Sequence, residues 1–447
     1  MPSRPASPLI REVIQPAWAG SIGVAAVVWT AWFALHLPWL GLSEQIAKPI
    51  LLATWFVALI VASIGALHHR RIKVGVTCGF YSSLLGLAIF LSMSSPQSAS
   101  EAGVVPGLAL LIPGFLVLGS VLGLFAGVVA KSLGWPVPPG GEPDWFKRAA
   151  IMTVVAASPL LFVGGMVTST NSGMAVPDWP GTFGSNMFLY PLGPTVDPAV
   201  YFEHSHRLFG TLTGLTTIIL FVWALLADRG GRVKVWAGLV LLLVIAQGVL
   251  GGIRVRMGDA DPTRDMRFFA VIHGVLAQIV FAMMTTLCVY LSRGYREIAA
   301  FDGARKLRVF GTAALHLTLV QLVLGALYRH LRHGHSLWAH VGFATLVIIA
   351  ALIAGFLCVA LAGRAGAPGR LLKAWGIALL IAVTVQYLLG WVAFMGGGRA
   401  LEAATQAQAY IRTLHQANGA LMLATVTVVA VLARKAWPRG SRPAASA

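Results

Sequence analysis

The sequence is poor in charged side chains, which make up 11% of its 447 residues, against roughly 25% in a soluble domain. Acidic residues are scarcest, with 15 Asp and Glu against 33 Lys and Arg. Hydrophobic residues make up 57% and gather in runs of about 20, the length of a helix that crosses a bilayer. This composition excludes a soluble enzyme and predicts an all-α polytopic membrane protein, because backbone groups in lipid must pair within helices.

Cysteine is also rare, which excludes a disulfide framework. Cys78, Cys288 and Cys358 lie far apart inside apolar runs, without the spacing of an external disulfide or a metal motif. Packing is their expected role. The net charge of +18 does not predict nucleic-acid binding, because the Lys and Arg lie in short segments between apolar runs, without interleaved aromatics.

Twelve apolar runs are long enough to span a membrane. They lie near 17–37, 50–67, 74–92, 107–130, 149–168, 204–226, 235–253, 268–291, 309–328, 337–361, 374–394 and 415–434. The segments on the side of both termini hold most of the Lys and Arg, whereas the longest segment on the other side, 169–203, has none. The positive-inside rule then predicts a multi-pass protein of a bacterial-type inner (plasma) membrane with both termini cytoplasmic.

A Pro- and Gly-rich stretch over 131–148 divides the chain into an extension and a core. We expect a four-helix extension of unknown role over 1–140, a linker end over 141–148, and an eight-helix core. The pattern Gln-x-[Val/Leu]-Leu-Gly recurs at 247–251, 321–325 and 386–390, before three of the core's histidine-bearing runs. This repeat predicts two parallel four-helix halves, 149–300 and 301–447. Helix packing is the simplest interpretation of the motif itself.

Four histidines begin apolar runs of the core on the same predicted outer side of the membrane: His206, His273, His340 and His415. Two imidazoles on facing helices at matched depth are typical of a six-coordinate heme iron. The repeat predicts the arrangement twice, with His206 paired to His273 and His340 paired to His415. A single histidine near a helix end is more often only hydrogen-bonded at the interface, so the hypothesis rests on the repetition.

Glu203 precedes His206 by three residues and therefore shares its helix face. A carboxylate there could touch the rim of a porphyrin held by His206. The alternative is a helix-end acid paired with Arg207. Leu337 takes the matching place before His340. This asymmetry predicts a reactive first half and a second half that holds a fixed cofactor.

Other polar residues cluster near the same helix ends. Heme propionates are anionic and would be matched by guanidinium groups, although lipid headgroups are an alternative partner. The candidates for these contacts are Arg207, Arg254, Arg256, Arg329 and Arg412. A histidine-rich loop, with His330, His333 and His335, is a weak candidate for a separate metal site. His316 lies within an apolar run, where a buried, hydrogen-bonded histidine is expected.

Several of these segments resemble the heme A synthase family. The resemblance covers about 149–437 and rests on GGMVTSTNSGMAVPDWPGTFG, EHSHRLFGTLTG, QGVLGGIRV, HGVLAQ and HQANGALML. It implies an oxidoreductase that converts heme O, the substrate, to heme A by hydroxylating a porphyrin methyl group to a formyl group, with heme b as cofactor.

Carried over by position, the resemblance assigns a role to each candidate. It implies that His206 and His273 bind the iron of the substrate heme and that His340 and His415 bind that of heme b. It makes Glu203 the catalytic carboxylate. Asp178 and Trp179 match the outer-loop motif and would shape the entrance to the reactive site, although a tight Pro-flanked turn is an alternative reading of them.

The expected partners are the lipid bilayer, heme O synthase or the cytochrome oxidase assembly machinery, and an unidentified electron acceptor. Assembly of the protein into a homo-oligomer is a further possibility that the sequence leaves open.

The chain departs from this family in its outer loop. Where many members carry two cysteines, Val176 and Thr182 stand here, which excludes a thiol role. Thr168 replaces a common basic residue, and the four-helix extension is additional. Two other functions stay open from sequence: a diheme b-type cytochrome that transfers electrons, and a heme-binding assembly factor without turnover.

Overall fold

The computed structural model describes residues 7–94, 107–136, 143–192, 196–227, 229–260, 266–396 and 405–437. Within these ranges, twelve helices are long and apolar enough to cross a membrane. The same ranges contain no β-strand, only an isolated bridge between Thr182 and Ser185. The prediction of an all-α polytopic membrane protein is confirmed, as is the number of spans.

The chain forms two compact units. Unit 1 comprises Met1–Val167 and Ser172–Val244, and unit 2 comprises Thr168–Asn171 and Ile245–Ala447. The boundary falls inside one helix, because the long helix Gly231–Ala260 runs from one unit into the other. The boundaries predicted at 140, 148 and 300 stay predictions.

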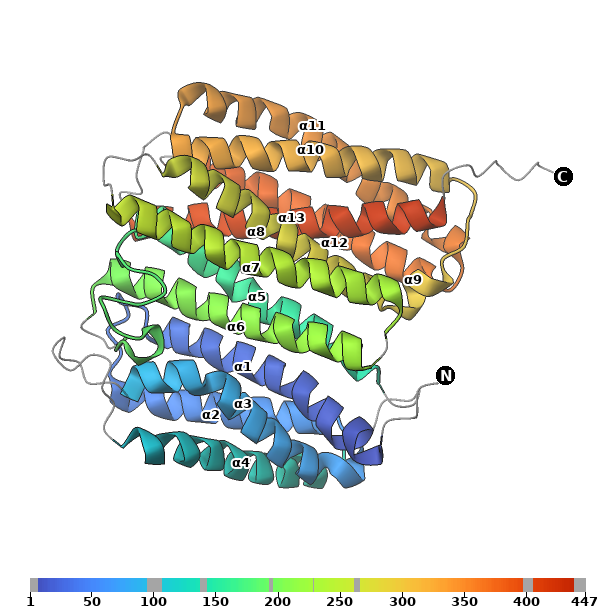
Figure 1. Cartoon of the computed structure of the whole chain (residues 1–447). Helices are drawn as coiled ribbons and strands as arrows, with labels where there is room; N and C mark the ends of the chain where they lie inside the picture. Colours follow the sequence, from blue (N-terminus) through green and yellow to red (C-terminus); the bar gives the residue numbers. More distant parts are fainter. Residues whose placement is uncertain are drawn as a thin grey trace. The chain divides into compact units, whose positions relative to one another are not determined.

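Unit 1 contains the helices of the predicted extension together with the first two of the core. They are η1 (Ile10–Ile14), α1 (Gln15–Leu35), α2 (Glu44–Ile64), η2 (His68–Arg70), α3 (Arg71–Ser94), α4 (Leu108–Ser132), α5 (Trp145–Ser169), η4 (Met187–Leu189), α6 (Pro198–Leu226) and the first part of α7 (Gly231–Ala260). Helix α1 contacts α2, α3 and α6, and α3 contacts α4 most extensively (Figure 1). The extension therefore packs directly on α6.

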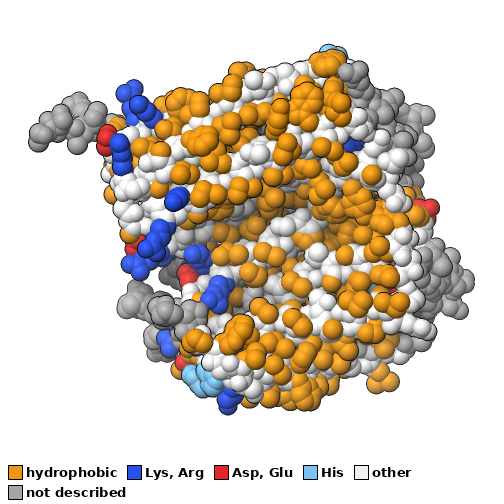
Figure 2. Space-filling view, turned by 180° about the vertical axis from the view of Figure 1, so that it is seen from behind, with side chains coloured by type: hydrophobic (Ala, Val, Ile, Leu, Met, Phe, Trp, Pro, Cys, Tyr) orange, Lys and Arg blue, Asp and Glu red, His pale blue; other side chains and the backbone are white. Residues whose placement is uncertain are grey.

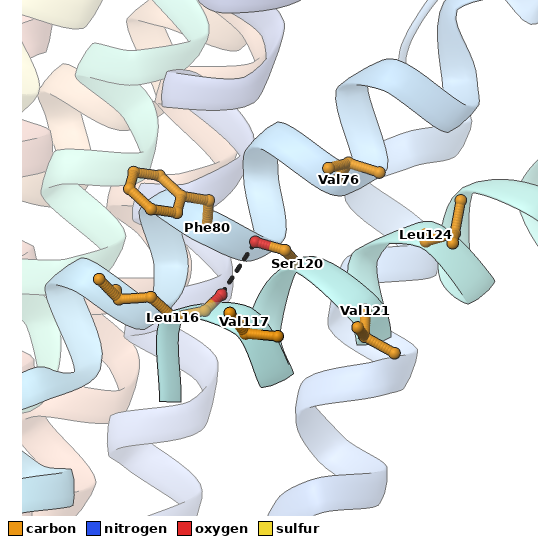
Figure 3. A pocket seen from close by; sticks show the side chains of 7 residues that line it. All are labelled: Val76, Phe80, Leu116, Val117, Ser120, Val121 and Leu124. Atoms are coloured by element: carbon orange, nitrogen blue, oxygen red, sulfur yellow. Dashed lines mark hydrogen bonds between the residues drawn. The ribbon is translucent and has the colours of Figure 1, made fainter. Parts of the chain in front are cut away.

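Glycines allow α3 and α4 to approach closely. A Cβ atom on Gly79 would lie 2.0 Å from the carbonyl oxygen of Gly119, and one on Gly123 would lie 2.1 Å from that of Gly75. Small residues at this spacing are a usual way for membrane helices to pack. A surface groove between the same helices is lined by apolar side chains, among them Val76 and Phe80 of α3 and Leu116 and Leu124 of α4 (Figure 3). Its one polar side chain, Ser120, donates to a carbonyl of its own helix, so the groove offers no chemistry.

Unit 2 contains the remaining helices. They are the rest of α7, α8 (Arg267–Tyr290), α9 (Arg293–Glu297), α10 (Ala304–Leu331), α11 (Gly334–Ala360), η5 (Ala362–Ala365), α12 (Gly369–Met395) and α13 (Gln406–Ala436). Helices α10 to α13 pack consecutively, α13 returns to α10, and α8 packs against both α10 and α13. Three of the four histidine-bearing helices therefore lie in unit 2.

Several helices begin earlier than the apolar runs from which they were predicted. Helix α6 begins at Pro198, where the Asp197 side chain accepts from the amides of Ala199 and Val200. Helix α13 begins at Gln406 behind a Thr405 cap. Polar first turns and caps carry no hydropathy signal. Hydrophobic side chains cover the middle of the helices, and Lys and Arg side chains gather toward helix ends, on the face shown in Figure 2.

Candidate functional site

The four histidines lie about two turns inside their helices, deeper than their position at the start of the apolar runs implied. His206 lies in α6 of unit 1, and His273, His340 and His415 lie in α8, α11 and α13 of unit 2. All four are at least half buried. The pairing of His206 with His273 stays a prediction.

Each histidine ring rests against a glycine of the preceding long helix. A Cβ atom would lie 2.9 Å from the ring of His206 if built on Gly164, and 2.8 Å from that of His340 if built on Gly325. For Gly390 and the ring of His415 the distance is 3.1 Å. Gly251 and His273 form the fourth such pair, at 3.5 Å. A shared backbone position therefore holds all four imidazoles at the same place in the repeat.

His340 and His415 face each other within unit 2. Their ring centres lie 6.3 Å apart and their planes are inclined by 82°. Two imidazoles that each place a nitrogen about 2 Å from one metal ion have ring centres roughly this far apart. The ring nitrogen Nδ1 of His340 lies 3.2 Å from the carbonyl oxygen of Gln321, the usual partner of a metal-binding imidazole's second nitrogen. The geometry fits an iron held between the two rings.

Glu203 is buried on α6, one turn before His206, as predicted. It is 4% exposed. Its Oε2 accepts from the amide of Val176 at 3.0 Å, and its Oε1 accepts from Arg207 at 2.9 Å. The carboxylate is therefore fixed by the outer loop on one side and by its own helix on the other. The pairing with Arg207 that the sequence allowed does occur, and it places a carboxylate with few degrees of freedom beside a histidine.

Arg207 fastens the outer loop to α6. Its Nη1 donates to the carbonyl oxygens of Asp178 and Gly181 at 2.7 and 2.9 Å. Its Nη2 donates to Glu203 and, at 2.9 Å, to the carbonyl oxygen of Val176. A guanidinium can reach several acceptors at once because its donors fan out in a rigid plane. The structure thus gives Arg207 a positioning role, and its contact with a propionate stays a prediction.

Asp178 closes a tight turn, the alternative reading that its sequence context favoured. Its carboxylate accepts from the amides of Phe183 and Gly184 at 2.7 and 2.9 Å. A Cβ atom on Gly181 would lie 2.7 Å from the same carboxylate. Trp179 is half buried in this turn. A role for Asp178 and Trp179 at the entrance of a site stays a prediction.

The two positions at which the family often has cysteine serve the loop in other ways. Val176 is fully buried and presents its amide to Glu203. Thr182 is also fully buried, and its hydroxyl lies 3.1 Å from Nδ1 of His204. The loop is therefore held to α6 by hydrogen bonds at both places.

The extension also contacts this loop and α6. Tyr201 donates its hydroxyl to the carbonyl oxygen of Phe33 on α1 at 2.7 Å, and the two rings stack 5.6 Å apart. Ser92 of α3 donates to the carbonyl oxygen of Tyr190 at 2.5 Å, and the Tyr190 ring lies 5.4 Å from that of His204. Burial raises the pKa of the Tyr190 phenol above its ordinary value. The extension thus supports the segment that carries Glu203, a role that sequence did not suggest.

The arginines predicted to meet propionates differ in their surroundings. Arg329 donates to the hydroxyl of Ser169 at 2.9 Å and to the carbonyl oxygen of Arg412 at 3.4 Å. Arg254 is half buried at the outer part of α7, and Arg256 is exposed. Arg329 and Arg412 form a basic pair within unit 2, near the C-terminal end of α10 and the N-terminal end of α13. Their predicted ligand stays a prediction.

The structure tests two further predictions, one about His316 and one about the cysteines. His316 is exposed on α10 and bonds to its own helix at the carbonyl oxygen of Thr312, 2.7 Å away, so the expectation of burial is wrong. An apolar run does not reveal which helix face looks inward. Cys78 and Cys358 are buried, which confirms the expected packing role for these two cysteines.

The histidine-rich loop does not assemble a metal site in the described part of the chain, where no three His, Cys, Asp or Glu side chains are placed to hold one ion. His333 and His335 are exposed and stack 5.3 Å apart, whereas His330 is half buried at the end of α10. The neighbouring side chains supply no third ligand, so the weak prediction of a separate metal site finds no support.

The glycines under the histidines are the site residues that sequence analysis missed. Gly251, Gly325 and Gly390 end the repeated Gln-Gly motif, which was interpreted as packing. The sequence signal that could have revealed them is that each motif precedes a helix that carries one of the histidines. Gly164 has Leu160 four residues before it in place of Gln, so the motif did not reveal it.

Part of the chain is similar to proteins of known family. Residues 147–346 match the family model described as "Cytochrome oxidase assembly protein". The chain is 28% identical to a heme A synthase from an Exiguobacterium species over 174 residues, which cover 38% of this chain and 54% of that protein. It is 30% identical to the heme A synthase of Lysinibacillus sphaericus over 191 residues, covering 42% and 57%. The heme A synthase of Rhodopseudomonas palustris strain BisB18 is 28% identical over 243 residues, covering 47% and 65%.

The chain thus spans little more than half the length of most of these relatives. The family model begins close to the start of α5 and ends within α11, so it includes His206, His273 and His340. The resemblance to the heme A synthase family is confirmed for this part of the chain.

Proposed function

We propose that this membrane protein is an oxidoreductase that converts heme O to heme A, on the basis of the similarity of part of the chain to heme A synthases. The reaction turns a methyl substituent of the porphyrin into a formyl group by successive hydroxylations. With an electron acceptor as the oxidant, water supplies the oxygen atom of each hydroxylation, and the electrons and protons removed from the carbon pass to the acceptor and to a base. The observation that carries the proposal is the buried Glu203, fixed by Val176 and Arg207, one helical turn from His206.

The second histidine pair would hold heme b. His340 and His415 have the separation that a shared iron needs, and the contact of His340 Nδ1 with the Gln321 carbonyl leaves Nε2 for the metal. Heme supplies redox chemistry when bound, and axial histidines set its potential. Arg329 and Arg412, near the outer ends of α10 and α13, would meet its propionates.

His206 and His273 would hold the substrate heme in the first half. Arg254 follows Gly251, whose built Cβ meets the His273 ring, by three residues on the same helix, so it would be placed to meet a propionate. Glu203 would accept a proton from the carbon under oxidation or stabilise positive charge that develops there. Its fixed position would limit the reorganisation needed during that step.

We further propose the wider setting of the enzyme. The bacterial relatives and the twelve apolar helices support a bacterial plasma membrane, and the distribution of Lys and Arg supports cytoplasmic termini with the heme sites near the outer face. Heme O synthase and the cytochrome oxidase assembly machinery would be its partners.

A diheme b-type cytochrome is the strongest competing function, because the His340–His415 geometry would serve it equally well. The two differ in their product. Full-length protein should be produced in cells that make heme O but no heme A, and the hemes should be extracted from purified membranes and separated chromatographically. Heme A or hydroxylated heme O in the extract supports the proposal. Heme b alone, with two per chain, would establish the cytochrome.

A further inference from the structure

We propose that the Gln-x-x-x-Gly segments 321–325 of α10 and 386–390 of α12 are packing surfaces, called seats below, that fix the orientation of the His340 and His415 rings. The segment of α10 also fixes the tautomer of His340. Gly325 and Gly390 are then positioning residues of the second heme site. The inference deepens the proposed function, because it rests on heme binding at this pair. It assigns a ligand-orienting role to a repeat that could otherwise serve only helix packing.

The glycine opens the surface of the helix to the ring. At Gly325, a Cβ atom would lie 2.8 Å from Cε1 and 3.1 Å from Nδ1 of His340, distances that real side chains do not adopt without a shift. At Gly390, a Cβ atom would lie 3.1 Å from Cε1 of His415. Any other residue would require the ring or the helix to shift.

The opening exposes a backbone carbonyl that selects the tautomer of His340. The carbonyl oxygen of Gln321, one turn before Gly325, lies 3.2 Å from Nδ1. A carbonyl oxygen can only accept, so Nδ1 carries the hydrogen. The side-chain Nε2 of Gln321 lies 3.4 Å from the ring Nε2, where an amide N–H requires a lone pair. Both contacts therefore place the lone pair on Nε2, the nitrogen that would bind iron, and the Gln321 amide would have to give up this contact when iron binds.

At His415 the seat has an additional support. Nε2 of Gln386 lies 3.3 Å from both ring nitrogens of His415, so the amide rests against the ring. The Oε1 atom of Gln386 accepts from Asn418 at 2.8 Å, and Asn418 also donates to the carbonyl oxygen of Ala382 at 2.9 Å. Since that carbonyl can only accept, it fixes the orientation of the Asn418 amide and, through it, that of Gln386.

The chain contains its own comparison for these seats. Gln247 donates to the carbonyl oxygen of His273 at 3.1 Å, as Gln321 does to that of His340 at 2.9 Å. A Cβ atom on Gly251, however, would meet the His273 ring at 3.5 Å, an ordinary van der Waals distance. The approach of the ring to the helix is therefore closer at Gly325 than at Gly251.

The decisive experiment compares Gly325→Ala and Gly390→Ala with the control variant Gly114→Ala. Each full-length protein would be purified with its hemes, and heme content and the low-spin electron paramagnetic resonance signals would be recorded. We expect the first two variants to lose the bis-histidine low-spin signal of one heme, and Gly114→Ala, a glycine of α4 with no neighbouring atom within 4 Å, to keep the wild-type spectrum. Unchanged low-spin signals in both Gly325→Ala and Gly390→Ala would overturn the inference.

A second variant covers the case in which these alanines prevent accumulation of the protein. Gln386→Met keeps the side-chain size but removes the amide N–H that rests against the His415 ring. That N–H withdraws electron density from the imidazole, so its loss should make the ligand more donating and lower the midpoint potential of the b-type heme. Thr384→Val, at an exposed position of the same helix, should leave the potential unchanged. An unchanged potential in Gln386→Met would overturn the role of the seat.

Different results would refute the proposed function and the proposed role of the seats. Wild-type protein that binds no heme, or shows no bis-histidine signal, would refute the proposed function itself. Wild-type protein with the expected spectrum, together with glycine and glutamine variants identical to it, would refute only the seats.

Discussion

Glu203 is one of only 15 acidic residues, and its position combines burial with two fixed hydrogen-bond donors. A carboxylate held in this way can act repeatedly at one place on a bound substrate, whereas a mobile one would spend time in unproductive orientations. Its neighbours explain the local sequence, because Val176 contributes a backbone amide and Arg207 a side chain four residues along the helix.

The catalytic assignment of Glu203 predicts a selective loss. Glu203→Gln keeps the size of the side chain and removes its ability to accept a proton, so the rate of heme A formation should fall by about 10²-fold or more. Bound heme should be retained, because the imidazoles are untouched. Heme extraction from variant and wild-type membranes measures both quantities. Glu297→Gln, at an exposed acid on α9, is the control, and wild-type product levels in Glu203→Gln would remove the assignment.

Arg207 offers a prediction about the outer loop. Lysine cannot reproduce the fork that reaches the carbonyl oxygens of Asp178, Gly181 and Val176. Arg207→Lys should lower the free energy of opening of residues 176–184 by about 2–4 kcal/mol. Hydrogen exchange at the amides of this segment would measure the change.

A matched control exists in α9, where Arg296 donates to a carbonyl oxygen away from the loop. Arg296→Lys should leave exchange in residues 176–184 unaffected. If Arg207→Lys also left it unaffected, the fastening role would be wrong.

At the scale of elements, the contact of α3 with α4 depends on the absence of side chains. The backbones meet at Gly75, Gly79, Gly119 and Gly123, where any Cβ would overlap a carbonyl group. At these positions the two helices therefore pack by shape, in keeping with a lipid environment in which apolar burial alone does not favour helix association.

Alanine substitution along α4 separates packing from helix propensity. Gly119→Ala should destabilise the protein by about 1–3 kcal/mol, because its Cβ would overlap Ser83 and the backbone of Gly79. Gly114→Ala, on the same helix with no neighbouring atom within 4 Å, should be neutral or stabilising by up to about 1 kcal/mol. Thermal unfolding in detergent would compare the two, and equal melting temperatures would contradict the close approach.

At the scale of the molecule, the extension and the first helices of the core form one compact unit. Tyr201 bonds to Phe33, and Ser92 bonds to Tyr190, across the boundary that the Pro-rich stretch suggested. The helices over 1–140 therefore contribute to the stability of the segment that bears Glu203. Sequence gave them no role because they have no chemical motif of their own.

Removal of the extension tests this interdependence. A chain that begins at Asp144 should accumulate poorly and form little heme A, because the aromatic contacts of α6 with α1 are lost. Co-expression of residues 1–136 as a separate polypeptide should restore part of the product, since no covalent link is needed for the contacts. Full heme A formation by the truncated chain alone would show that the extension is dispensable to the site.

The sequence alone determined the fold class and number of spans, because helix-length apolar runs are a local property that lipid converts directly into transmembrane helices. It also singled out His206, His273, His340, His415 and Glu203 through a repeat and a family resemblance. It did not reveal that Gly164 meets the ring of His206, and it wrongly predicted that His316 is buried. Hydropathy does not show which atom a residue meets on a neighbouring helix.

Tertiary structure decided those contacts. The approach of His340 to the bare backbone at Gly325, the 6.3 Å separation from His415, and the dependence of the outer loop on Arg207 all join residues of different segments. Such contacts depend on the register and rotation of whole helices, which arise from the sum of their packing and are not encoded in any single run of residues.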